Sequence, residues 1–81
     1  MGKIVKSIVL RTKVNEYGYA DEAEFRQTKE DDGSIRYDLW YVERWTDGHI
    51  TYPSLRHRRF RSAEEGNRVY KDHLNTYKRV R

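Results

Sequence analysis

The fold is decided by the stretch Ile35-Arg36-Tyr37-Asp38-Leu39-Trp40-Tyr41-Val42-Glu43-Arg44-Trp45, where strand-favouring residues run longest with a period of two. Successive residues of a strand point to opposite faces of its sheet. One face of this predicted central strand is mostly apolar, with a single interruption at Glu43. Its apolar members are Ile35, Tyr37, Leu39, Tyr41 and Trp45. We expect this face to cover the core.

The other face of the predicted central strand is mixed. Trp40 and Val42 stand between charged residues, with Arg36 and Asp38 before them and Arg44 after them. Large apolar side chains flanked by arginines are typical of a surface that contacts a partner. We therefore expect this face to be partly open for binding.

Two further strands are predicted upstream of the central one. Residues 4–14 are rich in β-branched residues and precede a turn signal at Asn15 to Gly18. Residues 20–29 tolerate both a helix and a solvated strand. Because they lie between this turn and the second signal, Asp32-Gly33, at hairpin spacing, we expect a strand.

Downstream, Asp47-Gly48 predicts another hairpin turn and a short strand over residues 49–52. Pro53 has no backbone N–H, so a continuation over residues 55–61 must lie at a sheet edge or follow a bend at Pro53-Ser54.

A helix is predicted to follow, since Ser62 and Glu65 have the spacing of a capping box. Its apolar stripe is expected to contain Gly66, Val69, Tyr70, His73, Leu74, Tyr77 and Val80. We expect Leu74 to pack into the core and Gly66 to lie close to Trp45 or Tyr41. The predicted fold is α+β: a small antiparallel sheet of about four strands with one C-terminal helix packed on one face (ββββα), as a single domain over residues 1–81.

Composition limits the class of protein. The 81 residues include no cysteine, which excludes disulfides and thiolate metal sites. No apolar run approaches the roughly 20 residues of a membrane span. We expect a soluble, cytoplasmic protein that does not bind membranes.

No arrangement of residues predicts an enzyme. His49, His57 and His73 lack the spacing of a metal site, and no phosphate-binding loop, nucleophile elbow or carboxylate pair is present. We expect no catalytic residues, no metal and no cofactor.

Positive charge is concentrated toward the C-terminus. Residues 1–52 hold eight Lys and Arg against ten Asp and Glu, whereas residues 53–81 hold nine against three. Arginines interleaved with aromatics can bind phosphates and stack on bases. The first functional hypothesis is a nucleic-acid-binding module, DNA or RNA, that uses Arg56, Arg58, Arg59, Arg61, Tyr52 and Trp40.

The second hypothesis is a protein-interaction module, such as an inhibitor, an adaptor or a homodimer. Its partner would be an acidic protein surface or a second copy of the chain. The predicted contact residues are Trp40, Val42, Arg36 and Arg44. The arginines of residues 56–61 also permit a structural interpretation, in which they pair with carboxylates on neighbouring strands, at Glu22, Glu24, Asp31 or Asp32.

Residues 37–77 place a strand ending at Trp45, a turn, a further strand and a capped helix in an order that resembles the WGR domain, a DNA-break-binding module. This resemblance implies DNA binding. In this chain Trp45 is followed by Thr46 and Asp47 where the WGR domain has Gly-Arg, so no functional residue is carried over.

Overall fold

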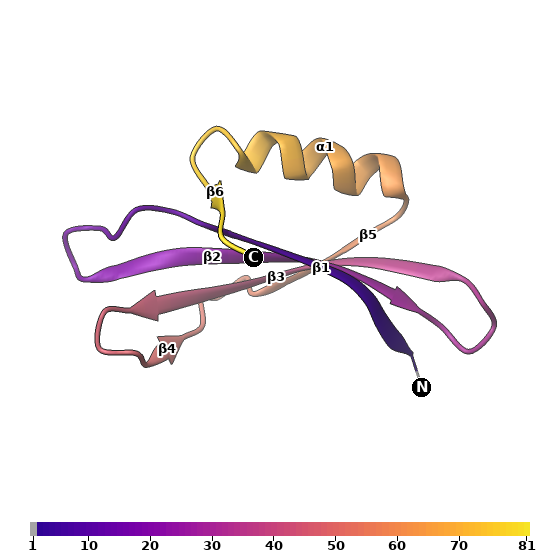
Figure 1. Ribbon diagram of the computed structural model, residues 1–81, viewed down its shortest axis with the longest axis horizontal. Helices are drawn as coiled ribbons and strands as arrows, with labels where there is room; N and C mark the ends of the chain where they lie inside the picture. Colours follow the sequence, from indigo (N-terminus) through magenta and orange to yellow (C-terminus); the bar gives the residue numbers. More distant parts are fainter. Residues whose placement is uncertain (1) are drawn as a thin grey trace.

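The computed structural model describes residues 2–81 as one antiparallel sheet with a single helix over one of its faces (Figure 1). The elements are β1 (Lys3–Arg11), β2 (Tyr19–Lys29), β3 (Ile35–Trp45), β4 (Ile50–Thr51), β5 (His57–Phe60), α1 (Ala63–His73) and β6 (Lys78–Arg79). The predicted α+β class and antiparallel sheet are confirmed. The predicted number of about four strands is wrong, since the sheet has six.

The centre of the sheet is the long hairpin of β2 and β3, which pair over their whole lengths from Tyr19↔Trp45 to Lys29↔Ile35. Residues 20–29 are therefore a strand, as predicted from the flanking turns. Gly33 and Gly48 have φ of 88° and 97° in the two Asp-Gly turns that bracket β3. These positive φ values favour glycine, which has no Cβ to clash.

The outer strands extend this hairpin on both sides in the order β4-β3-β2-β1-β6. β5 also pairs with β3, at Tyr37 to Trp40, while β4 pairs with Glu43 and Arg44. One edge of β3 thus receives two short strands in succession. The chain leaves the sheet between them around Pro53 and Ser54, where a bend was predicted.

The core lies between α1 and the sheet face that carries Leu39. Its buried centre is Ala23, Leu39 and Phe60, and the residues packed against it are Phe25, Tyr37, Tyr41, Val69 and Tyr77. Leu39 and Leu10 are both 0% exposed. This confirms that the alternation of residues 35–45 identifies the core face. We call it the helix face.

The helix begins as predicted, with Ser62 as N-cap accepting a hydrogen bond from the backbone N–H of Glu65. It ends earlier than its apolar stripe, because the chain turns at Leu74 to Thr76 and β6 pairs with Leu10 and Arg11 of β1. Leu74 is 45% exposed. The prediction that Leu74 packs into the core is wrong.

Gly66 is buried in α1, and the helix backbone approaches Phe60 there, where Trp45 or Tyr41 was predicted. A Cβ at this position would lie 3.2 Å from Cδ2 of Phe60.

We expect Gly66→Leu to lower the free energy of unfolding by about 1–3 kcal/mol through overpacking. Urea denaturation measures this, with Arg68→Leu on the exposed side of α1 as control. Equal effects of the two substitutions would contradict the close contact.

Candidate functional site

Within residues 2–81, no helix covers the sheet face opposite α1 (Figure 1), and we call it the open face. The register of the strands gives it five arginines and three carboxylates, so its net charge is positive. These residues are Arg11, Glu22, Glu24, Arg26, Arg36, Asp38, Arg44 and Arg59. Trp40 and Val42 lie on the same face, as their position in β3 predicted.

Glu22 is a buried carboxylate that holds two arginines. Its side chain is 9% exposed and accepts hydrogen bonds from Nε of Arg11 at 2.8 Å and Nε of Arg44 at 2.7 Å. Burial by itself would raise the pKa of Glu22, but the hydrogen bonds from Arg44 and Arg11 outweigh it and hold the pKa below its ordinary value. Glu22 therefore stays charged and fixes the direction of both guanidinium groups.

Asp38 has the same role in the adjoining part of the open face. The side chain is 2% exposed and bonds to Nε of Arg36 and Nε2 of His57, each at 2.8 Å. Burial opposes ionisation here too, but the hydrogen bonds from His57 and Arg36 lower the pKa of Asp38. Glu24 similarly accepts hydrogen bonds from Nη2 of Arg26 at 2.7 Å and from Oγ of Ser7 at 2.6 Å.

The arginines above these carboxylates remain accessible. The side chains of Arg11 and Arg44 are 40% and 43% exposed, whereas the carboxylate between them is nearly covered. A guanidinium group has five N–H donors, so one bond to a carboxylate leaves donors for another acceptor. The open face thus carries oriented arginines over the buried carboxylates of Glu22 and Asp38 and the half-buried carboxylate of Glu24.

Trp40 lies between residues of the two neighbouring strands. Its ring stacks on His57 of β5 with centroids 4.0 Å apart, and Cζ of Arg26 of β2 lies 5.4 Å from the ring centroid. Nε1 of Trp40 is buried without a hydrogen-bond partner among residues 2–81. These contacts already occupy Trp40, so a base that stacked on its ring would have to displace a neighbour.

A groove on the open face begins beside Trp40 and extends to the connection between β4 and β5. Tyr52 in this connection is 56% exposed, and Cζ of Arg56 lies 5.2 Å from its ring centroid. The groove is lined by Glu24, Arg26, Trp40, Tyr41, Val42, Tyr52 and Arg56. It combines an accessible aromatic ring, two cations and one carboxylate, and we take it as the candidate site.

The structure brings residues of both predicted sites into this groove. Tyr52 and Arg56 come from the predicted nucleic-acid site, Val42 comes from the predicted protein-binding site, and Trp40 was predicted for both. Of the other predicted residues, Arg36 and Arg44 lie on the open face bound to carboxylates. Arg59 lies there as the register partner of Asp38.

Arg58 and Arg61 are separated from the groove. Arg58 points to the helix face, where Cζ lies 5.2 Å from the ring centroid of Phe60 and Nη2 lies 3.1 Å from Oε1 of Glu65. The backbone N–H of Arg61 donates to Glu65 next to the start of α1. The segment from Arg56 to Arg61 is therefore not one continuous basic strip, because adjacent strand residues face opposite ways.

Sequence reasoning missed Glu24 and Arg26 as groove residues, and Asp38 as a carboxylate that orients an arginine. Glu22 was expected as a partner of the arginines of residues 56–61, but it holds Arg11 and Arg44. The signal was available, since alternate residues of 20–29 share a face in a strand. The pairing of Glu22 with Arg11 and Arg44 depends on the register of β2 with β1 and β3.

Among residues 2–81, no cluster of three or more His, Asp or Glu side chains could hold a metal ion. Nor does the described part of the chain contain a helix long and apolar enough to cross a membrane.

Comparison with protein-family models, curated proteins and solved structures finds no match for this chain.

Proposed function

We propose that the protein is a small nucleic-acid-binding module whose open face contacts the phosphate backbone. The observation that carries this proposal is the arginine layer, in which Glu22 and Asp38 fix guanidinium groups that remain partly exposed. Arginine donors match phosphate oxygens in geometry as well as charge. Holding the arginines in place before binding reduces the side-chain entropy lost when a ligand is bound.

The groove supports single-stranded nucleic acid as the preferred form. The bases of single strands can leave the stack and contact aromatic side chains, whereas those of a duplex are enclosed. Tyr52 is exposed at the rim of the groove and Arg56 lies beside it. In this proposal a base stacks on Tyr52 and Arg56 contacts an adjoining phosphate.

A second candidate function is binding of an acidic protein surface, or a second copy of the chain, by the same face. It is supported by the apolar part of the groove, where Val42 and Trp40 are flanked by arginines. Arginine and tryptophan are enriched at binding hot spots. Such a complex would depend chiefly on the apolar area buried, and less on salt.

Salt dependence tests the first proposal. Each phosphate neutralised on a single strand contributes about −0.7 to the slope of log affinity against log salt. We expect Arg56→Ala to flatten the slope by about 0.7. We expect Tyr52→Ala to weaken binding about tenfold without changing the slope, because it removes stacking rather than charge. The measurement is fluorescence anisotropy with labelled single-stranded DNA and RNA.

Arg68→Ala is the matched control, because Arg68 carries the same charge and lies exposed on α1. It should leave the slope unchanged. If Arg68→Ala flattened the slope as much as Arg56→Ala, binding would reflect net charge and not this face. If neither DNA nor RNA bound at low salt, the nucleic-acid proposal would be wrong.

A further inference from the structure

The sheet has a free edge along the first two thirds of β1. β6 pairs with Leu10 and Arg11, and Val9 exchanges backbone hydrogen bonds with Val80 and Arg81. Among residues 2–81, no segment pairs with the outer side of residues 3–8. Ile4 and Val5 are each 51% exposed there. An unpaired edge presents backbone donors and acceptors that can bind another strand.

The direction of these backbone groups follows from Val9. Its N–H and C=O point outward, since both bond to the segment that contains β6. In an antiparallel ladder this direction repeats every two residues, and the register of β1 on β2 is regular from Lys6 to Arg11. The N–H and C=O of Ser7 therefore also point outward, toward the position that an added strand would occupy.

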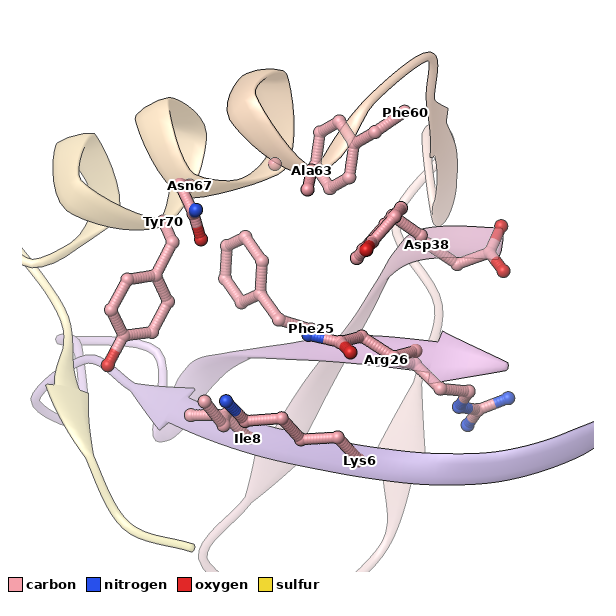
Figure 2. A pocket seen from close by; sticks show the side chains of 12 residues that line it. Lys6, Ile8, Phe25, Arg26, Asp38, Phe60, Ala63, Asn67 and Tyr70 are labelled. Atoms are coloured by element: carbon pink, nitrogen blue, oxygen red, sulfur yellow. The ribbon is translucent and has the colours of Figure 1, made fainter. Parts of the chain in front are cut away.

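A groove on the helix face opens beside this edge. It has a volume of about 180 Å³ and is lined by residues of α1, β1, β2, β3 and β5. Figure 2 shows Phe25 at its centre below the helix, between Tyr70 and Phe60, with Ile8 and Lys6 along β1. An apolar cavity of about 150 Å³ holds a benzene molecule. This groove therefore has room for one aromatic or branched aliphatic side chain.

Three lysines give the approach to the groove a positive charge. Lys3 and Lys29 are register partners, and Lys6 lies on the same face as both, opposite Gln27. All three are exposed, and no ion pair is formed between them and the other described residues. Carboxylates of a partner would complement this charge.

We propose that this edge and groove bind an extended acidic segment of a partner protein. The segment adds to β1 as a further strand next to β6 and places one apolar side chain in the groove, while its Asp or Glu residues face the lysines. In strand addition, main-chain hydrogen bonds supply affinity and side-chain pockets supply specificity. A second copy of β1 fits less well, since antiparallel pairing would put the lysines of both copies on one face of the joined sheet.

The groove and the open face lie on opposite sides of the sheet, so the two proposals can be tested separately. The test is selection of binders to the full chain from a displayed library of random peptides. We expect enriched peptides to contain one aromatic or branched apolar residue flanked by Asp or Glu. Their affinities are then measured by fluorescence anisotropy.

Two pairs of variants locate the binding site. Ser7→Pro removes the outward N–H, while Ser7→Ala removes only the hydroxyl, which bonds to Glu24. Asn67→Trp places a large ring beside the groove, while Arg68→Trp adds the same ring to α1 outside it. We expect Ser7→Pro and Asn67→Trp to weaken peptide binding more than about tenfold, and both controls to change it less than about twofold. Circular dichroism checks that each variant is folded.

Lys6→Glu provides a substitution that does not depend on packing, because Lys6 is exposed. It should weaken acidic peptides more than about tenfold. The proposal would be overturned if no peptide were enriched, or if the enriched peptides bound Ser7→Pro, Asn67→Trp and Lys6→Glu as tightly as the parent chain. Sedimentation as a dimer that Ser7→Pro dissociates would also overturn it, by assigning the edge to a second copy.

Discussion

Leu39→Ala is expected to lower the free energy of unfolding by about 2–5 kcal/mol, the range for a large-to-small change at a buried site. Leu39 is 0% exposed and lies with Ala23 and Phe60 at the centre of the core. The substitution leaves a cavity where β2, β3 and β5 meet beneath α1. Urea denaturation at neutral pH measures the change. In a domain of this size, such a loss is a large part of the total stability.

Leu74→Ala is the matched control, since it makes the same chemical change at a site that is 45% exposed. We expect it to cost about 0.5 kcal/mol, as surface substitutions usually do. A large effect at Leu74 together with a small effect at Leu39 would show that the core lies elsewhere.

Asp38→Asn is expected to destabilise the protein by about 1.5–3 kcal/mol at neutral pH, the range for hydrogen bonds to charged groups. The substitution removes the charge that Arg36 and His57 share, at a side chain that is 2% exposed. Asp47→Asn is the control, because Asp47 also bonds to a histidine, His49, but is 68% exposed. An exposed pair of this kind contributes little.

The effect of Asp38→Asn also depends on pH. Burial alone would raise the folded-state pKa of Asp38, but the hydrogen bonds from His57 and Arg36 hold it below its ordinary value of 3.8. A carboxyl whose pKa is lowered on folding stabilises the protein above its unfolded pKa, and this contribution is lost as the pH falls through the folded pKa. The difference in stability between the parent chain and Asp38→Asn should therefore be largest at neutral pH and shrink below about pH 4.

Urea denaturation of both proteins, at a series of pH values from 7 into the acidic range, measures this difference. Glu22 and Glu24 also have lowered pKa values. Comparing the two proteins cancels the contribution of Glu22 and Glu24, since both proteins contain these residues. A difference that stayed constant down to acid pH would mean that the charge of Asp38 is not what stabilises the fold.

The sequence predicted the parts of the fold that depend on local pattern. The alternation of residues 35–45 identified the core face, and the Asp-Gly turns placed the strands on either side. The capping box located the start of α1. The end of the helix was not predicted, because helical spacing continues through Tyr77 and Val80. Pairing of β6 with β1, a contact far apart in sequence, ends the helix earlier.

The candidate site was predictable only in part. Trp40 and Val42 were placed on the open face by their position in the strand. The alternation of side chains along a strand would also have placed Arg58 and Arg59 on opposite faces of the sheet. The groove itself needs the chain between β4 and β5 to bring Tyr52 and Arg56 beside Trp40, and no local pattern gives that. Glu22 is bonded by Arg11 and Arg44 of the neighbouring strands, and Asp38 by His57 of β5, so these contacts appear only with the register.

The long β2–β3 hairpin has a consequence for the order in which the chain folds. Its two strands pair in register from end to end and are joined by the turn at residues 30–34, so its contacts close short loops. Short loops close fastest and with the smallest loss of entropy. We expect the hairpin to form first and to serve as the template on which β1 docks from one side and β5 with α1 from the other. Docking of β5 would then complete both faces in one step, since β5 supplies Phe60 to the helix face and His57 and Arg59 to the open face.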